Sequence, residues 1–219
     1  MGMIFGKETV AEPPFSVVLT RAERSASLAY EVRKYEERFG AEVSYPDGNS
    51  DDGTPFGILA RYIGVFGDPE NEGNEKISMT APVVKQGGTP IAMTAPVVKS
   101  EQDGEETMMF MLPTSYDELS KIPKPTDPRV SIREMPPEFG AVHRFNGSFD
   151  DDRAQKMATE LGSQLRQDGV DISESDVLSM YQFWGYNPPF TIPYFRRNEV
   201  WIPLTQAQVD TLQSDFSLN

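Results

Sequence analysis

Apolar and polar residues alternate over short stretches of this chain, a pattern typical of strands whose two faces meet different surroundings. The alternation is clear where Tyr30, Val32 and Lys34 fall on one face. A later run, Met108 to Met111, is apolar throughout, which predicts burial on both faces. These runs predict strands at Phe15–Arg21, Ala29–Tyr35, Phe39–Tyr45, Glu105–Leu112, Arg129–Met135, Ala141–Phe145, Val177–Tyr186 and Asn198–Leu204.

Two segments have the helical spacing instead. Thr54 suits a helix N-cap and Pro55 the first helical position. One apolar stripe then follows at i, i+3, i+4 and i+7, formed by Phe56, Leu59, Ala60 and Ile63. In the second segment Ser148 and Asp151 resemble a capping box, and Gly169 suits the C′ position. Its stripe consists of Ala154, Met157, Ala158, Leu161 and Leu165.

The order of these elements is strands, helix, strands, and then the same again. This order predicts an α+β domain of two related halves under a shared sheet, rather than a doubly wound parallel fold. Beyond the last strand, Val209, Leu212 and Phe216 have the spacing of a short helix packed on the surface.

A nearly repeated segment lies in the middle of the chain, as Lys76–Val84 and again as Thr89–Val98. Each copy is a β-prone run broken by a proline, which cannot donate a ladder hydrogen bond and so belongs at a strand end or a sheet edge. The glycines of Lys85–Gly88 predict a turn between the copies.

The chain of 219 residues carries a formal net charge of −14. Such a field repels phosphate backbones and anionic membranes, so we expect no nucleic-acid partner. No stretch approaches the ~20 apolar residues of a membrane span, and Met1–Lys7 is too weakly apolar for a signal peptide. We therefore expect a cytoplasmic protein, with a plastid location only if a transit peptide has been removed.

Candidate chemistry is sparse. Cysteine is absent, which excludes disulfides, zinc ribbons and thiol catalysis, and His143 is the single histidine, so we expect no metal centre. The acidic runs Glu70–Glu72 and Asp150–Asp152 lack the spacing of a calcium loop. The methionines fit an irregular core or the wall of a site for a flat ligand. The aromatic residues of Tyr181–Trp201, with two arginines among them, fit either packing or a pocket for a carboxylate.

Several segments together resemble the SOUL haem-binding protein family, especially its plant and algal members. They are Met1–Lys7, Tyr30–Tyr35, Ala60–Gly64, Lys76–Val84, Phe110–Pro113, Pro123–Asp127, Phe145–Gly147, Gly185–Pro189 and Arg197–Trp201. The resemblance implies a pseudo-twofold fold with a strongly twisted, mostly antiparallel sheet of about eight strands flanked by two long helices. It covers 1–204 as a single domain and leaves 205–219 as a C-terminal extension.

The resemblance also implies a haem or related tetrapyrrole bound in a hydrophobic groove beside the first helix, on the stripe of Phe56, Leu59, Ala60 and Ile63. Arg61 would pair with a propionate. Lys34 stands where one relative has a histidine proposed as an axial ligand, and Thr191–Ile192 stand near a lysine of some relatives. Because haem iron is ordinarily held by His, Cys, Met or Tyr, we expect binding through the faces of the ring.

Three functions follow from this interpretation. The first is a non-catalytic carrier or buffer for a tetrapyrrole. The second is an enzyme that modifies a tetrapyrrole, in which Lys34, Arg61, Tyr62 or His143 would act as acid or base. The third is a protein-interaction module that docks a partner through the apolar stripe of the first helix or through the C-terminal tail.

Overall fold

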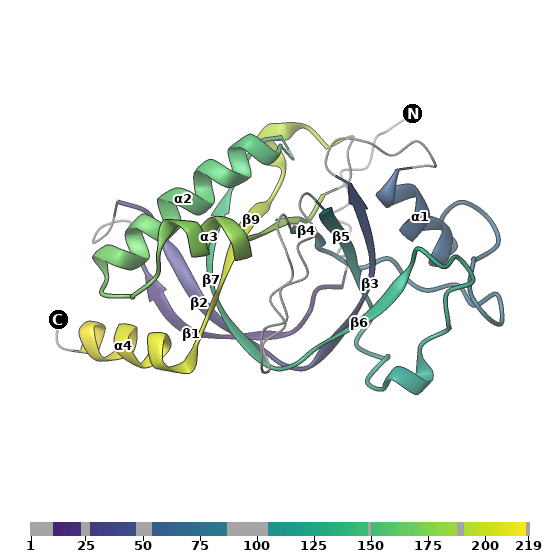
Figure 1. Ribbon diagram of the computed structural model, residues 1–219, viewed down its shortest axis with the longest axis horizontal. Coiled ribbons are helices and arrows are strands. Elements are labelled where there is room, and N and C mark those ends of the chain that lie inside the picture. The colour runs from purple at the N-terminus through teal and green to yellow at the C-terminus, as the bar shows by residue number, and fades with distance from the viewer. Residues whose placement is uncertain are drawn as a thin grey trace, which may run out of the picture.

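The computed structural model describes residues 11–22, 27–46, 54–86, 105–148, 150–187 and 191–217. Across these residues, nine strands form one strongly curled antiparallel sheet in the order β1-β2-β7-β9-β8-β4-β5-β3-β6 (Figure 1). The α+β prediction is therefore confirmed. The strands are β1 (Phe15–Arg21), β2 (Tyr30–Tyr35), β3 (Arg38–Pro46), β4 (Val83–Gln86), β5 (Glu105–Met111), β6 (Ser131–Met135), β7 (Glu138–Phe145), β8 (Gln182–Gly185) and β9 (Asn198–Leu204).

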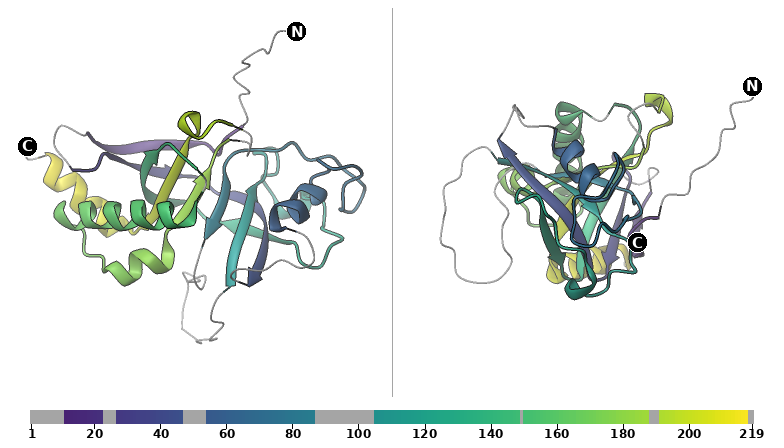
Figure 2. Two further views of the ribbon diagram at one scale, coloured as in Figure 1. Left: turned by 90° about the horizontal axis from the view of Figure 1, so that it is seen from above. Right: turned by 90° about the vertical axis from the view of Figure 1, so that its right-hand side faces the viewer.

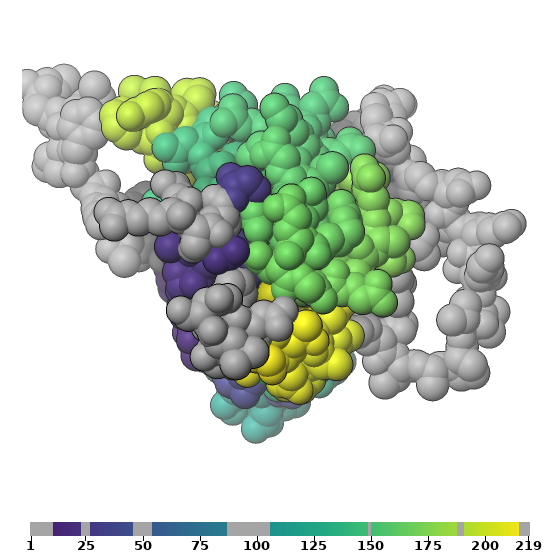
Figure 3. Space-filling model, turned by 90° about the vertical axis from the view of Figure 1, so that its left-hand side faces the viewer, coloured from purple at the N-terminus to yellow at the C-terminus, as the bar shows by residue number. Residues whose placement is uncertain are grey.

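The helices of the described chain gather at two ends of this sheet (Figures 1 and 2). Helix α1 (Pro55–Tyr62) packs against β3 and β5 at one end. Helices α2 (Asp151–Gln167) and α3 (Glu174–Met180) lie at the other, where both contact β9. With α4 (Gln206–Ser217) they form the green and yellow centre of the face in Figure 3. The short 3-10 helices are η2 (Leu119–Lys121) and η3 (Pro193–Phe195).

Three buried clusters follow from this arrangement, one under each helical group and one on the opposite face of the sheet. The α2 core contains, among others, Val32, Ala158, Leu161, Leu165 and Val209. The α1 core contains Phe39, Leu59, Tyr62, Ile63 and Phe110. The opposite-face core contains Tyr35, Met109, Met111, Trp184 and Trp201. Successive residues of β5 enter different cores, so its predicted burial on both faces is confirmed.

Helix starts show how well local chemistry can be predicted from sequence. Thr54 is the N-cap of α1, where its hydroxyl accepts a hydrogen bond from Gly57 N at 3.1 Å, and Pro55 follows as predicted. The capping box expected at Ser148 is wrong. Asp150 caps α2 by accepting from Arg153 N at 3.1 Å, because its carboxylate both satisfies a free N–H and complements the helix dipole.

The strand predicted at Val177–Tyr186 is also wrong over its first half, where the chain forms α3. The cause is a capping box one turn earlier. The Ser173 hydroxyl accepts from Asp176 N at 3.0 Å, and the Asp176 carboxylate accepts from Ser173 N at 3.3 Å. The strand β8 occupies only the last part of the predicted run.

The repeated segment is placed only in its first copy, since the second lies outside the described residues. Pro82 directly precedes β4, as expected for a proline at a strand end. However, β4 is an inner strand between β8 and β5, and Lys85 and Gln86 are part of it. The predicted turn therefore does not begin at Lys85.

A buried ion network joins β2 and β9 on the opposite face of the sheet. Arg33 Nη1 lies 2.9 Å from Glu199 Oε2, and the Tyr186 hydroxyl donates to the same oxygen at 2.7 Å. Burial raises the pKa of Glu199, but the charges of Arg33 and Arg197 outweigh it and hold that pKa below its ordinary value. The fully buried Glu199 carboxylate thus links β2 to β9 across the intervening strand β7.

The C-terminal helix α4 is part of the same packed body. Its Val209 and Leu212 are buried in the α2 core. Gln208 Nε2 also donates to the Asp171 carbonyl at 2.9 Å, which ties α4 to the connection between α2 and α3. The predicted helix is confirmed, although Val209 and Leu212 lie inside the core.

Candidate functional site

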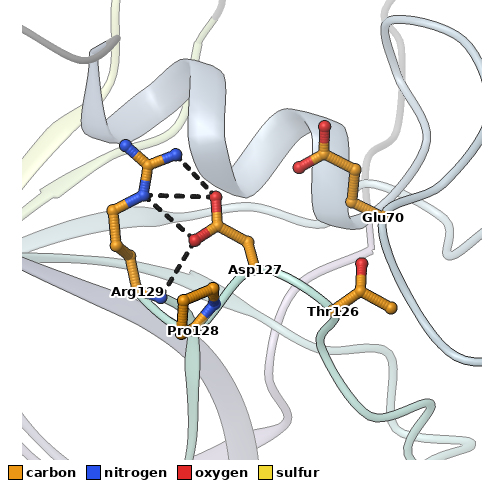
Figure 4. A pocket seen from close by; sticks show the side chains of 5 residues that line it. All are labelled: Glu70, Thr126, Asp127, Pro128 and Arg129. Atoms are coloured by element: carbon orange, nitrogen blue, oxygen red, sulfur yellow. Dashed lines mark hydrogen bonds and ion pairs between the residues drawn. The ribbon is translucent and has the colours of Figure 1, made fainter.

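A cleft of about 560 Å³ opens beside α1 (Figure 4). It is lined by Glu70, Thr126, Asp127, Pro128 and Arg129. Its volume lies in the range of about 300–1,000 Å³ that sites for small organic ligands have, but its lining residues are largely polar where theirs are mostly apolar. The cleft brings together two segments far apart in sequence: the loop that follows α1 and the loop that leads into β6.

Backbone hydrogen bonds hold these two segments together. Glu70 N donates to Arg61 O at 3.0 Å, so the loop folds back on the last turn of α1. Thr126 N donates to Glu70 O at 3.1 Å and Glu72 N to Lys124 O at 2.8 Å. The main chain therefore fixes the position of Glu70 whatever its side chain does.

Two ion pairs of different strength stand at the cleft. Arg61 Nε contacts Glu70 Oε1 at 3.1 Å, and the two side chains are 34% and 39% exposed. Arg129 donates two hydrogen bonds to the Asp127 carboxylate, from Nε to Oδ1 at 3.0 Å and from Nη2 to Oδ2 at 2.7 Å. Hydrogen bonding from Arg129 lowers the pKa of Asp127, and the charge of Arg61 adds to this. Only 10% of the Asp127 side chain is exposed, so the second pair is the more firmly held.

The outward face of α1 carries Phe56, Gly57 and Arg61, which are all partly exposed. Gly57 leaves the middle of this face flat. A Cβ there would lie 3.2 Å from Thr54 Oγ1 and 3.8 Å from Arg61 Nη1, so the guanidinium extends back along the helix over the glycine. Arg61 also pairs with Glu70, so this ion pair stands where the flat face meets the cleft.

The apolar stripe predicted as the ligand groove faces the other way. Leu59 and Ala60 are completely buried and Ile63 is 3% exposed, all three in the α1 core. In this structure these side chains therefore have no free surface for a ligand. Phe56 alone of the stripe is partly exposed, with its ring edge-on to Phe110 at a centroid distance of 5.2 Å.

Lys34 does not meet the other predicted site residues. It lies on β2, which pairs with β1 and β7 at the end of the sheet covered by α2. Its ammonium is 3.4 Å from Glu36, and 41% of its side chain is exposed. The structure thus places Lys34 at the end of the sheet opposite α1.

Thr191 and Ile192 are likewise separate from α1. They lead into η3, where the Pro193 carbonyl accepts from Gly147 N at 3.0 Å, just before α2 begins. The Thr191 carbonyl accepts from Arg196 Nε at 2.7 Å, and Ile192 is exposed. Figure 1 shows this segment beside the start of α2.

The aromatic and arginine cluster before β9 supports the packing interpretation. Arg197 stacks on Tyr186, 3.8 Å from the ring centroid, and its Nη2 lies 2.9 Å from Glu199 Oε1. The carboxylate that Arg197 holds is thus one of the protein's own, and Arg196 donates to the Thr191 carbonyl. Tyr194 and Phe195 remain exposed on η3.

Six residues of the cleft and the flat face were not among the predicted site residues: Gly57, Glu70, Thr126, Asp127, Pro128 and Arg129. Two weak signals existed. Asp127 ends the family-like segment Pro123–Asp127, and a glycine in the first turn of an amphipathic helix suggests a position where bulk is unwanted. The meeting of these residues depends on the fold.

The groups named as acid or base candidates have structural partners. The Tyr62 hydroxyl is buried and donates to the Pro123 carbonyl at 2.8 Å. His143 Nδ1 lies 2.7 Å from the Ala29 carbonyl, at the α2 end. Among the described residues, no three His, Asp or Glu side chains are grouped to hold a metal ion, and no helix is long and apolar enough to cross a membrane.

Comparisons place the chain among known proteins. The model of the family described as SOUL heme-binding protein matches residues 10–203. No curated protein matches. The crystal structure of the EcmrR C-terminal domain is similar in fold, with a TM-score of 0.51 and 10% identity over 86% of this chain and 99% of that one. The cryo-EM structure of an EcmrR–DNA complex has a TM-score of 0.51 and 10% identity over 80% of this chain and 56% of that one.

Proposed function

Because the chain belongs to the SOUL heme-binding protein family, we propose that it acts as a carrier or buffer for haem or a related tetrapyrrole. Family membership over residues 10–203 is the observation on which this proposal rests, since it implies tetrapyrrole binding in general. The proposal extends that general property to a location on this chain and to a non-catalytic role.

We place the ligand on the outward face of α1 and in the adjoining cleft. The macrocycle would lie across Gly57 once the Arg61 guanidinium, which extends over the glycine in this structure, turns aside toward a propionate. Phe56 would contact one edge, and Arg61 would reach a propionate at the other. The partly buried Val83 and Met108 of the α1 core add apolar surface at this end of the sheet.

The energetics of such a shallow site are adequate. Burying ~300–400 Å² of apolar ligand surface at ~25 cal/mol per Å² gives roughly 8–10 kcal/mol before the cost of association. A dissociation constant in the micromolar to submicromolar range follows once that cost is subtracted. A tetrapyrrole supplies this site with a rigid apolar disc and carboxylate groups at one edge.

Binding through the ring faces fits the side chains near α1. Tyr62, the tyrosine of the helix, is fully buried and has its hydroxyl engaged, so it cannot serve as an axial ligand in this structure. We therefore expect metal-free porphyrin to bind nearly as well as haem. A role as carrier also agrees with the structural partners of Tyr62 and His143.

The experiment is a titration of the protein with haem and with metal-free protoporphyrin, followed by the Soret band. We expect saturable binding of both pigments at micromolar concentration or below, and chromatography should recover each pigment unaltered. Absence of saturable binding would overturn the proposal, and a chemically changed pigment would favour the enzyme interpretation instead. An unrelated acidic protein of similar net charge serves as the control for nonspecific adsorption of the pigments.

A further inference from the structure

The arginine best placed to receive a ligand carboxylate already holds one from its own chain. Arg61 Nε contacts Glu70 Oε1 at 3.1 Å, at the edge of the flat face over Gly57. Both side chains are about one-third exposed, so solvent and ligand can reach the pair. A surface ion pair of this kind contributes little to stability and exchanges readily.

The second arginine of the cleft is at least as exposed as the first, with 41% of its side chain accessible, but the carboxylate that it holds is much less accessible. Arg129 holds Asp127 through Nε and Nη2, and the backbone N–H of Arg129 donates to the same carboxylate at 2.9 Å. The Asp127 side chain is nearly buried, and the two residues are almost adjacent in sequence. A ligand carboxylate would have to break several charge-assisted bonds to replace Asp127, so this pair stays intact.

The position of Glu70 does not depend on its ion pair. Its N–H donates to the Arg61 carbonyl at 3.0 Å and its carbonyl accepts from Thr126 N at 3.1 Å. The main chain thus holds a carboxylate opposite the guanidinium, and the side chain can turn into solvent without disturbing α1. Glu70 has the charge, the reach and the freedom to leave that a competitor requires.

We propose that Glu70 is a built-in competitor that occupies the carboxylate position on Arg61 until a propionate of the ligand displaces it. This inference rests on the proposed function. It makes Arg61 selective for tetrapyrroles with free carboxylates, because only an ionised carboxylate can replace Glu70. It also means that the chain weakens its own hold on such ligands, which suits a buffer that must release its cargo.

The size of the effect follows from the exposed nature of the pair. Removing the Glu70 charge by Glu70→Gln frees Arg61 from a competitor whose strength is that of an ordinary surface ion pair. We expect affinity for protoporphyrin to rise about two- to five-fold. Affinity for protoporphyrin dimethyl ester, which has the same ring without ionised carboxylates, should not change. Arg61→Met should weaken binding of the acid and leave the ester unaffected.

The test is a set of Soret titrations with the acid and the ester, delivered from the same co-solvent, on the wild-type chain and these two variants. Glu72→Gln is the matched control, because it removes the same charge two residues away on an exposed side chain. A rise with Glu70→Gln that is specific to the acid, and absent in Glu72→Gln, supports the inference.

Failure of the inference is distinguishable from failure of the proposed function. If acid and ester bind equally and Glu70→Gln changes neither, Glu70 is not a competitor although the protein binds tetrapyrroles. An equal rise in Glu70→Gln and Glu72→Gln would show a general effect of net charge and would also overturn it. If neither pigment binds any variant, the proposed function itself is wrong.

Discussion

Filling the flat face of α1 should weaken ligand binding without unfolding the protein. Gly57 lies in the first turn of the helix, has no positive φ, and is partly exposed. Gly57→Leu therefore introduces a side chain that the backbone accepts. A helical glycine costs about 0.5–1 kcal/mol relative to a good helix former, so the change should stabilise α1 by about that amount.

One contact limits the gain in stability. The new Cβ would lie 3.2 Å from Thr54 Oγ1, which must shift by a few tenths of an ångström while it caps the helix. We therefore expect the free energy of unfolding to change by less than about 1 kcal/mol in either direction. Urea unfolding followed by circular dichroism measures this change.

The effect on the ligand should be larger. A leucine that lifts the ring from about 60 Å² of apolar contact removes roughly 1.5 kcal/mol at ~25 cal/mol per Å², or about tenfold in affinity. The assay is a Soret titration with protoporphyrin, and Lys156→Leu on the exposed side of α2 controls for an added surface leucine. Unchanged affinity in a folded Gly57→Leu protein would refute the placement of the ring over Gly57.

Three other perturbations test separate parts of the account. Arg61→Glu should weaken haem binding several-fold while Lys156→Glu, an equal charge reversal on α2, does not; equal losses would contradict the contact. Glu199→Gln should destabilise the fold by about 3–5 kcal/mol, because it removes the buried charge that Arg33 and Arg197 share and leaves Arg33 only the partly exposed Glu31. Since the folded pKa of Glu199 is lowered, its contribution is complete above the unfolded pKa of ~4.3 and is lost as pH falls through the folded value. The free energy of unfolding should therefore fall less in this variant than in the wild type as the pH is lowered. Urea unfolding from pH 7 to roughly pH 3, the range of that titration, measures the difference. Truncation after Leu204 removes two buried side chains of the α2 core and should cost about 3–6 kcal/mol, and an unchanged melting temperature would show that α4 is dispensable.

The limits of sequence interpretation are visible in α1. Thr54, Pro55 and the apolar stripe predicted the helix and its start, because caps and periodicity are local. The stripe did not reveal what covers it. Leu59 and Ala60 have the same spacing whether a ligand or the sheet lies against them, and in the structure it is the sheet. Of the outward residues that carry the proposed site, the glycine gave only a weak signal in the sequence and the arginine gave none apart from the family resemblance.

Contacts between distant segments were beyond local patterns altogether. The cleft exists because the loop at Glu70 and the loop at Thr126 exchange backbone hydrogen bonds, and nothing in either segment specifies the other. The same holds for Lys34 and Ile192, which the resemblance grouped with α1, whereas the fold places Lys34 on β2 beside β7 and Ile192 close to the start of α2. By contrast, the α3 error was avoidable, because the Ser173–Asp176 capping box is written in the sequence.

The proposal of most consequence is that the tetrapyrrole lies on the outward face of α1 and in its cleft. The most direct measurement is an amide-resolved NMR titration with metal-free protoporphyrin. We predict that the largest changes occur at Gly57, Arg61, Glu70 and Arg129, in proportion to saturation. Changes concentrated on α2 or on η3, with these four amides unaffected, would contradict it.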